Sequence, residues 1–263
     1  MAAVIRATLD GEEFLYHSAK HDPKTDVAGL FSEFDLVTQP LGFEQAVIGK
    51  PFLKLGVGSL IKTTEKYQFY TQYPISKLAE TRTTWTQDSV TFDQSYNEHG
   101  DYAYDLQVIE IVKENDLVIT WKLTNTGRVE IKTQHYSHNS FRFNNQGPGP
   151  DYILSFPFDF TAGGLRADVI QDGKGITFTK VLEKPINIAI NYPVDYQGDN
   201  SLTLINNKTQ QQIVAATSVP GNRIALHIAP QYICPEQFVE IAVKPGESKT
   251  WERKYTFSKI GNH

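Results

Sequence analysis

No stretch of ten or more residues in this chain repeats its apolar side chains with the period of an amphipathic helix. Strand-favouring residues dominate instead, because 13 Tyr and 15 Phe accompany many Val, Ile and Thr, which fit a pleated, half-buried surface. Glycine and proline interrupt the chain at short intervals, as they do where strands are joined by turns. The sequence therefore predicts an all-β protein made of antiparallel strands.

The clearest strand signals lie in the middle of the chain. Residues 102–112 partly alternate between apolar and polar, and residues 117–124 run back after a turn. Another strand is expected within residues 129–143, so that the three would form a meander of two hairpins. Further strands are expected at residues 176–179, 186–190, 201–205, 212–217, 223–228, 239–243 and 251–257.

The composition predicts one large folded domain. The chain has 263 residues, of which 40% are hydrophobic and 21% charged, so a mainly disordered chain is excluded. All-β sandwiches reach this length as single units. No linker composition divides the chain, since the Gly/Pro run at residues 147–150 is short and lies between expected strands. We predict a single domain over residues 1–263, with two or more packed sheets.

Charge and motifs exclude several partners and cofactors. A net charge of −5 argues against a broad nucleic-acid groove. No apolar run approaches the length of a membrane span or a secretion signal, which predicts a cytoplasmic protein without a membrane partner. Cys234 is the only cysteine, so an intrachain disulfide and a multi-thiolate metal site are excluded. Nucleotide-binding loops are absent, and we expect no cofactor.

His138 lies in a segment whose alternation separates two faces. Gln134, Tyr136 and His138 would share one face, which offers the hydrogen-bonding and stacking groups that a sugar-binding wall requires. His135 would point the opposite way, so His135 and His138 are not expected to share a metal ion. The alternative is that His138 is a hydrogen-bonded histidine of a half-buried sheet.

Glu236 is a carboxylate among apolar neighbours, in the segment Tyr-Ile-Cys-Pro-Glu-Gln-Phe at residues 232–238. Burial shifts carboxyl groups in general toward the range in which a general base works. The alternatives are a carboxylate on a loop, or one paired with Arg or Lys.

The order of several short motifs resembles the aldose 1-epimerase (galactose mutarotase-like) superfamily. Residues 100–106 and 117–127 are similar to two strands that precede a histidine motif in that superfamily, and Tyr-Ser-His-Asn-Ser-Phe at 136–141 is similar to the motif itself. Ile-Cys-Pro-Glu at 233–236 resembles the segment that carries the superfamily's base, and Pro-Gly-Glu at 245–247 resembles the turn that follows. The resemblance spans residues 29–257 and implies a β-supersandwich of large antiparallel sheets with an open cleft.

The resemblance also implies a function. By position, His138 would be the general acid and Glu236 the general base of an enzyme that interconverts the anomers of a sugar by opening its ring. This chemistry needs neither a metal nor another cofactor. A half-buried carboxylate and an imidazolium are suited to the two proton transfers.

The chain departs from the superfamily where an earlier histidine is expected. Residues 49–58 contain no histidine, and Lys54 is the candidate cation there, or else a surface lysine. Arg82 and Arg142, with Tyr136, are candidates for binding substrate hydroxyls, a carboxylate or a phosphate. The missing histidine makes an unusual sugar, a uronic acid or an oligosaccharide as plausible as a common hexose.

Two other functions stay open on the same scaffold, because a fold does not select among the activities it carries. One is a non-catalytic carbohydrate-binding protein, and the other is a carbohydrate lyase. The predicted partner is a small-molecule carbohydrate, and the protein is expected to act as a monomer or homodimer.

Overall fold

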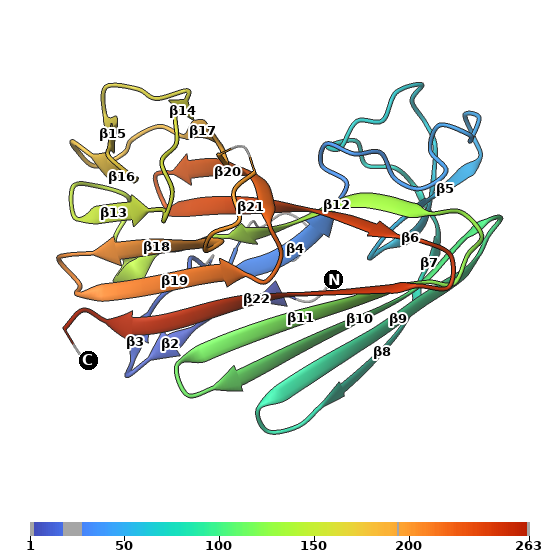
Figure 1. Cartoon of the computed structure of the whole chain (residues 1–263), viewed down its shortest axis with the longest axis horizontal. Coiled ribbons are helices and arrows are strands. Elements are labelled where there is room, and N and C mark those ends of the chain that lie inside the picture. Colours follow the sequence, from blue (N-terminus) through green and yellow to red (C-terminus); the bar gives the residue numbers. More distant parts are fainter. Residues whose placement is uncertain (1–2, 18–27, 194, 262–263) are drawn as a thin grey trace.

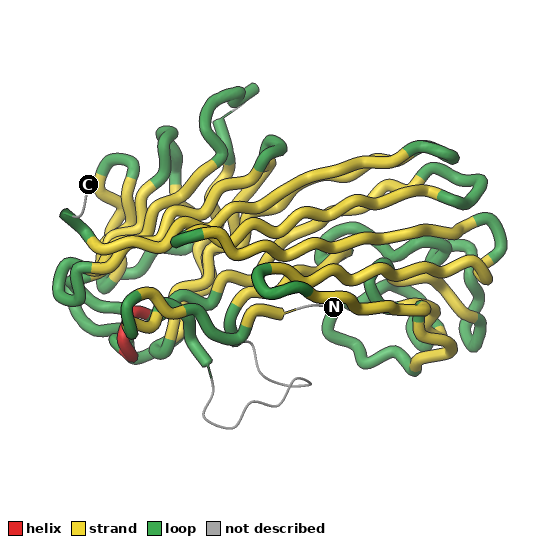
Figure 2. Tube along the Cα trace, turned by 90° about the horizontal axis from the view of Figure 1, so that it is seen from below, coloured by secondary structure: helices red, strands yellow, loops and turns green. Residues whose placement is uncertain are grey.

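The computed structural model is almost entirely β-strand, and it describes residues 3–17, 28–193 and 195–261 apart from the side chains of residues 98 and 99. Strand (yellow) dominates the whole trace in Figure 2, and helix is confined to the single-turn 3-10 helix η1 (Phe143–Asn145). No helix of the described residues is long and apolar enough to cross a membrane. The predicted all-β class is confirmed, while the ends of the predicted domain, residues 1–2 and 262–263, lie outside the described residues.

A seven-stranded antiparallel sheet has β12 and β21 at its centre (Figure 1). β12 is paired on both sides, with β4 and with β21, which fixes its register twice. Across this sheet the order is β1 (Ala3–Val4), β4 (Leu30–Phe34), β12 (Ile131–Asn139), β21 (Tyr232–Val243), β20 (Gly221–Ala229), β17 (Ile186–Asn191) and β14 (Ala162–Gly163).

A ten-stranded antiparallel sheet forms the second large layer. Its order is β15 (Val169–Asp172), β16 (Gly175–Phe178), β13 (Tyr152–Ser155), β18 (Ser201–Asn206), β19 (Gln211–Thr217), β22 (Ser248–Lys259), β11 (Asp116–Asn125), β10 (Tyr102–Lys113), β9 (Ser89–His99) and β8 (Glu80–Trp85). Two small sheets complete the described strands: the β2 (Thr8–Leu9) and β3 (Glu12–Glu13) hairpin, and the three-stranded sheet of β5 (Pro51–Lys54), β6 (Gly58–Ile61) and β7 (Ile75–Leu78).

The two large sheets pack face to face over one hydrophobic core. Strand alternation places every second residue in this core, so that Trp121 of β11 and Trp251 of β22 stack with ring centroids 6.1 Å apart. His135 of β12 meets them from the other sheet, where its Nδ1 accepts a hydrogen bond of 3.0 Å from Trp251 Nε1. Burial, with a contribution from nearby Arg253, lowers the pKa of His135 well below the ordinary histidine value, so this ring is neutral.

The predicted meander is wrong in its last strand. β10 and β11 form the expected hairpin, but β12 leaves that sheet and pairs with β4 and β21 in the opposite one. The turn after β11 is anchored by Asn125, whose Nδ2 donates to Val129 O and Val243 O at 2.9 Å each. These bonds tie the crossing segment to the end of β21. Local alternation does not distinguish a strand that returns from one that crosses to the other sheet.

Two predicted strand boundaries also need correction. The strand expected within residues 129–143 ends at Asn139, because Phe143 begins the 3-10 turn. The strand expected at 239–243 is the end of β21, which begins at Tyr232 and therefore includes Glu236. Glu236 thus lies in a sheet and not on a loop.

Asn139 is buried at the end of β12 and joins three strands. Its Oδ1 accepts a hydrogen bond of 2.7 Å from the Tyr255 hydroxyl of β22, and its Nδ2 donates to Pro235 O of β21 at 2.6 Å. Its backbone N–H donates to Cys234 Sγ at 3.2 Å. Because Asn139 follows His138 and contacts Cys234 and Pro235, the two residues that precede Glu236, it fixes the position of His138 along β12 relative to Glu236.

Tyr255→Phe should lower the free energy of unfolding by about 1–3 kcal/mol, because it leaves the buried Asn139 Oδ1 without its donor. Urea unfolding followed by fluorescence measures this difference. Tyr70→Phe is the matched control, since the Tyr70 side chain is 89% exposed, and it should leave the free energy unchanged. Equal stability of both variants would contradict the anchoring role of Tyr255.

Candidate functional site

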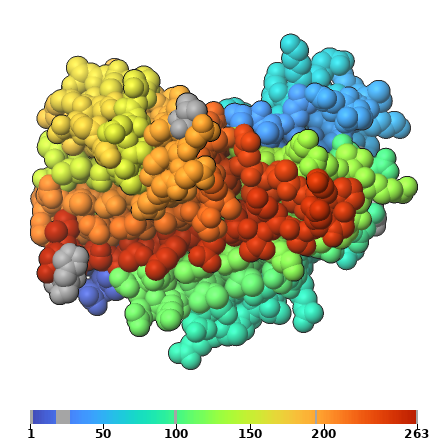
Figure 3. All heavy atoms as spheres, viewed as in Figure 1, coloured from blue at the N-terminus to red at the C-terminus, as the bar shows by residue number. Residues whose placement is uncertain are grey.

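The outer face of the seven-stranded sheet, turned away from the core, carries a group of polar and aromatic side chains. In the space-filling view a hollow separates the blue lobe that contains β5 from the yellow lobe that contains β13–β16, with the orange and red strands β20 and β21 below it (Figure 3). Alternation of β12 places Tyr136 and His138 on this outer face, and His135 on the core side, as predicted.

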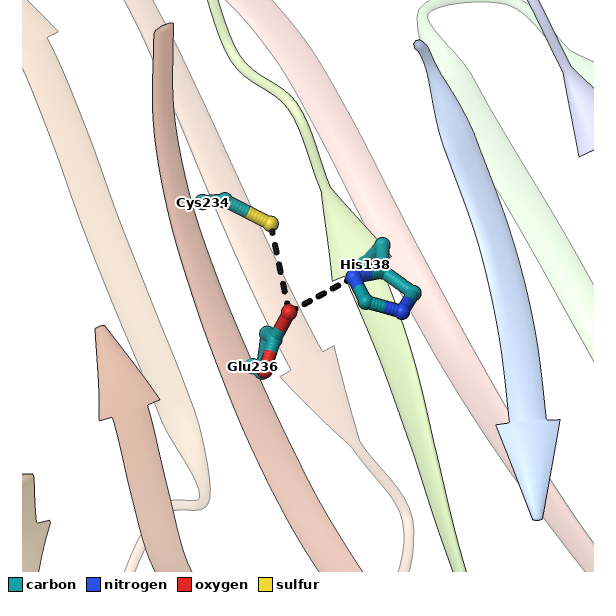
Figure 4. A group of neighbouring side chains, drawn as sticks. All are labelled: His138, Cys234 and Glu236. Atoms are coloured by element: carbon teal, nitrogen blue, oxygen red, sulfur yellow. Dashed lines mark hydrogen bonds and ion pairs between the residues drawn. The ribbon is translucent and has the colours of Figure 1, made fainter. Parts of the chain in front are cut away.

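The register of the sheet brings His138 to Glu236. Tyr136 is paired with Phe238 across the β12–β21 ladder, so two residues further on His138 comes level with Glu236. The His138 Nδ1 lies 2.6 Å from Glu236 Oε1 (Figure 4). The side chains of His138 and Glu236 are 15% and 10% exposed, so both are largely withdrawn from water yet accessible from this face. The two residues predicted as acid and base are therefore in direct contact.

Glu33 is a residue of this site that was not predicted from the sequence. It lies on β4, where its Oε2 is 3.1 Å from His138 Nε2 and accepts a 2.7 Å hydrogen bond from the Tyr136 hydroxyl. The available signal was an acidic residue on a strand whose neighbours alternate Leu-Phe-Ser-Glu-Phe, although nothing local connects this strand to β12. Tyr136, a predicted substrate-binding residue, is thereby placed beside His138 as a partner of Glu33.

The contacts of His138 with Cys234 and with two carboxylates determine its charge. Burial alone would lower the pKa of this histidine, but its contacts with Cys234, Glu236 and Glu33 outweigh burial and raise the pKa far above the ordinary value. Burial would likewise raise the pKa of Glu33, yet the hydrogen bonds with His138 and Tyr136 hold it below the ordinary value. At neutral pH His138 is therefore an imidazolium and Glu33 a carboxylate.

Aromatic rings enclose this charged group. The ring of Phe31 stacks on His138 with centroids 4.3 Å apart, and Tyr136 stacks on Phe238 at 4.6 Å. The guanidinium of Arg223 lies over the Phe238 ring, 4.1 Å from its centroid. Arg223 is a second residue of the site that was not predicted from the sequence. The strand predicted at 223–228 already placed every second residue, Arg223 among them, on one face, but did not show which face.

Lys54 reaches the edge of the site from the three-stranded sheet. Its Nζ donates to Phe34 O at 2.9 Å and to the Tyr67 hydroxyl at 3.2 Å. Burial lowers the pKa of Lys54, and the negative charges of Asp35 and Glu33 oppose that effect. The predicted cation is thus a half-buried lysine bonded to the backbone of Phe34, the residue after Glu33, rather than a free surface lysine.

The structure does not bring Arg82 or Arg142 to His138. Arg82 is exposed on β8 of the ten-stranded sheet, where it pairs with Asp93 across the ladder. Arg142 follows the end of β12, donates to Asn145 O at 2.9 Å and lies 5.7 Å from the Tyr16 ring centroid. The arginine on the outer face beside Phe238 is Arg223 instead.

Three residues of the site also have the donor atoms of a metal centre. One ligand atom each from His138, Cys234 and Glu236 lies within 4.8 Å of the other two. Cys234 is fully buried, and its Sγ is 3.7 Å from Glu236 Oε1. His135, the other histidine of the His-x-x-His segment, is not part of this group because it faces the core.

Comparison with solved structures identifies the fold. The Slr1438 protein from Synechocystis superposes with a TM-score of 0.64 at 16% identity, over 98% of this chain and 88% of its own. A galactose mutarotase-like protein from Clostridium acetobutylicum gives 0.62 at 13% identity, over 98% and 90%. A galactose mutarotase related enzyme from Lactobacillus acidophilus gives 0.60 at 12% identity, over 96% and 89%.

These likenesses confirm the predicted galactose mutarotase-like β-supersandwich. The sequence itself matches no known family profile, and no curated protein sequence is similar to it. The order of short motifs therefore indicated a fold that overall sequence similarity does not reveal.

Glu33→Gln should lower the pKa of His138. The amide keeps an oxygen for the Tyr136 hydroxyl but removes one of the negative charges that favour the imidazolium. NMR titration of the His138 ring, in EDTA, should show a lower midpoint in the variant than in the wild-type protein. An unchanged midpoint would mean that Glu33 does not hold the charge on His138.

The raised pKa of His138 and the lowered pKa of Glu33 predict how the free energy of unfolding depends on pH. The raised pKa of His138 stabilises the fold fully below the unfolded value of 6.5, and this contribution is lost as pH rises through the folded pKa. The lowered pKa of Glu33 stabilises the fold above the unfolded value of 4.5, and this contribution is lost as pH falls through the folded pKa. The loss of stability in Glu33→Gln, measured by urea unfolding, should therefore be largest between pH 4.5 and 6.5.

Proposed function

We propose that this protein is an aldose 1-epimerase-like enzyme that interconverts the α and β anomers of a sugar, with Glu236 as general base and His138 as general acid. The observation that carries the proposal is the 2.6 Å contact between His138 Nδ1 and Glu236 Oε1 on the outer face of the sheet. This contact places a proton donor, His138, next to a proton acceptor, Glu236, at a position that is accessible from the outer face. The mutarotase-like fold of the chain is consistent with this chemistry.

The reaction needs two proton transfers to neighbouring oxygens. Glu236 takes the proton of the anomeric hydroxyl while His138 Nδ1 gives its proton to the ring oxygen, and the bond between C1 and the ring oxygen breaks. The open aldehyde turns about the C1–C2 bond. Ring closure then returns one proton from Glu236 to the new anomeric hydroxyl and one from the ring hydroxyl to His138. The enzyme ends in its starting state.

The geometry suits this pair of transfers because both reacting oxygens are bonded to the same carbon. An acid and a base that act on them must have their reactive atoms close together, as His138 Nδ1 and Glu236 Oε1 are. When the sugar binds, its two oxygens replace the contact between the side chains. Each charged group thus exchanges one polar partner for another, which limits the cost of desolvation.

Glu33 acts as a positioning residue in this proposal. Its contact at His138 Nε2 fixes the ring orientation and leaves Nδ1 directed at Glu236. The carboxylate keeps the imidazole protonated before the sugar binds, and Tyr136 in turn holds the carboxylate. The acid is therefore charged at neutral pH.

Arg223 extends the range of sugars worth testing. Its guanidinium lies on the Phe238 ring beside the acid and base, and arginine binds carboxylates and phosphates with paired hydrogen bonds. A uronic acid or a sugar phosphate therefore belongs in the substrate panel together with neutral hexoses, pentoses and deoxysugars.

Glu236→Gln should slow the catalysed anomer exchange by about 100- to 10,000-fold, because the amide cannot accept the anomeric proton. Exchange NMR of each sugar in the panel, in EDTA and compared with the uncatalysed rate, measures this effect. Glu240→Gln is the matched control: Glu240 lies four residues further along β21 on the same face, where it pairs with Asn222, and its rate should equal that of the wild type.

Wild-type rates in the Glu236→Gln protein would show that the base is another residue. Sugar binding without accelerated exchange for any member of the panel would favour a carbohydrate-binding protein instead. Products with a new carbon–carbon double bond would favour a lyase.

A further inference from the structure

His138, Cys234 and Glu236 together form a compact set of one nitrogen, one sulfur and one oxygen donor. We propose that these three side chains bind a zinc-class divalent cation, with the fourth position open to water. The donor types are those that zinc prefers, and three protein ligands with one open position is the usual form of an accessible zinc site. The ion goes beyond the proposed sugar chemistry, which does not use it.

The distances require only a small adjustment. Around a tetrahedral zinc ion with bonds of about 2.0–2.3 Å, neighbouring ligand atoms are roughly 3.3–3.7 Å apart. Cys234 Sγ and Glu236 Oε1 already lie at 3.7 Å, and His138 Nδ1 and Glu236 Oε1 lie at 2.6 Å. The nitrogen and oxygen must therefore separate by about 1 Å. All three ligand atoms lie within 4.8 Å of one another.

The scaffold holds the three donors on rigid elements. Cys234 and Glu236 are two residues apart on β21 and so share one face, and His138 comes from the adjacent β12. The backbone N–H of Asn139 donates to Cys234 Sγ at 3.2 Å and so fixes the position of the sulfur. Two neighbouring strands thus present the site in a largely preformed state.

Glu33 supplies the outer shell that a metal-binding histidine usually has. Such a histidine donates its second ring N–H to a carboxylate, which fixes its tautomer and raises its strength as a ligand. Glu33 Oε2 lies 3.1 Å from His138 Nε2 and is itself held by Tyr136. The metal would then bind Nδ1, the nitrogen that faces Cys234 and Glu236.

Charge and protons balance on binding. The Cys234 thiolate and the Glu236 carboxylate neutralise the two positive charges of the ion. The proton on His138 Nδ1 and the thiol proton of Cys234 are released to water, so two protons leave for each ion bound. No oxidant or other reactant takes part.

The ion would occupy His138 Nδ1 and Glu236 Oε1, the atoms that transfer protons in the proposed reaction. Zinc should therefore inhibit anomer exchange, a consequence that rests on the proposed function, whereas metal binding itself does not. Metal binding is accordingly tested without any sugar.

The probe is Co²⁺, added to wild-type protein that has been freed of metal with EDTA. A thiolate-to-cobalt absorption band in the near ultraviolet should appear with one equivalent, and zinc should displace it. Cys234→Ser should abolish the band, because the absorption arises from the bond between the thiolate and cobalt. His227→Gln is the matched control, because His227 lies opposite Cys234 on β20 but pairs with Asn187, and it should bind cobalt like the wild type.

Absence of the band in the wild-type protein would overturn the proposal, as would a band that persists in Cys234→Ser. Loss of binding in His227→Gln together with normal binding in His138→Gln would overturn the assigned ligands. These outcomes are independent of anomer exchange measured in EDTA. A protein that exchanges anomers but gives no cobalt band keeps the proposed function, and one that gives the band without exchange keeps the metal site.

Discussion

The double pairing of β12, with β4 on one side and β21 on the other, is the constraint on which the candidate site depends. Glu33, His138 and Glu236 come from three strands that are neighbours in space, and Glu33 and His138 are 105 residues apart in the chain. A slip of one residue in either ladder would turn the outer face of β12 into the core. Asn139 prevents such a slip, because its side chain binds β21 and β22 at once.

The alternation of β12 gives its two histidines opposite electrostatic states. His135 lies between Trp121 and Trp251, where burial excludes the charged form and the ring serves as a neutral acceptor. His138, three residues further on, lies between Glu33 and Glu236, which favour the imidazolium. The residue type is the same, so the difference arises entirely from which face of the strand each histidine occupies.

Periodicity and motif order were sufficient to predict the all-β class, the mutarotase-like fold and the choice of His138 and Glu236 as site candidates, whereas the contact between these two residues emerges only from the strand register. They predicted correctly that His135 and His138 would face apart, because that follows from the strand period alone. Glu33 and Arg223 were not predicted, because their proximity to His138 depends on which strands pair. The crossing of β12 and the distant position of Arg82 were not predicted for the same reason, because the alternation of a strand is the same in either sheet.

The contact between His138 and Glu236 also accounts for how charged groups persist at a largely buried position. An imidazolium 15% exposed would be costly without a partner, and removing one member of a buried pair leaves the other uncompensated. Glu33 and Glu236 compensate the charge of the imidazolium before any ligand binds. A ligand that separates His138 from Glu236 must offer polar or charged groups to both, or else leave buried charges uncompensated. A sugar can do so with its two oxygens on C1, and a divalent cation can do so by binding the carboxylate directly and taking the place of the imidazolium proton. Both proposed ligands thus meet the same requirement, which is that the charge balance between His138 and Glu236 be restored.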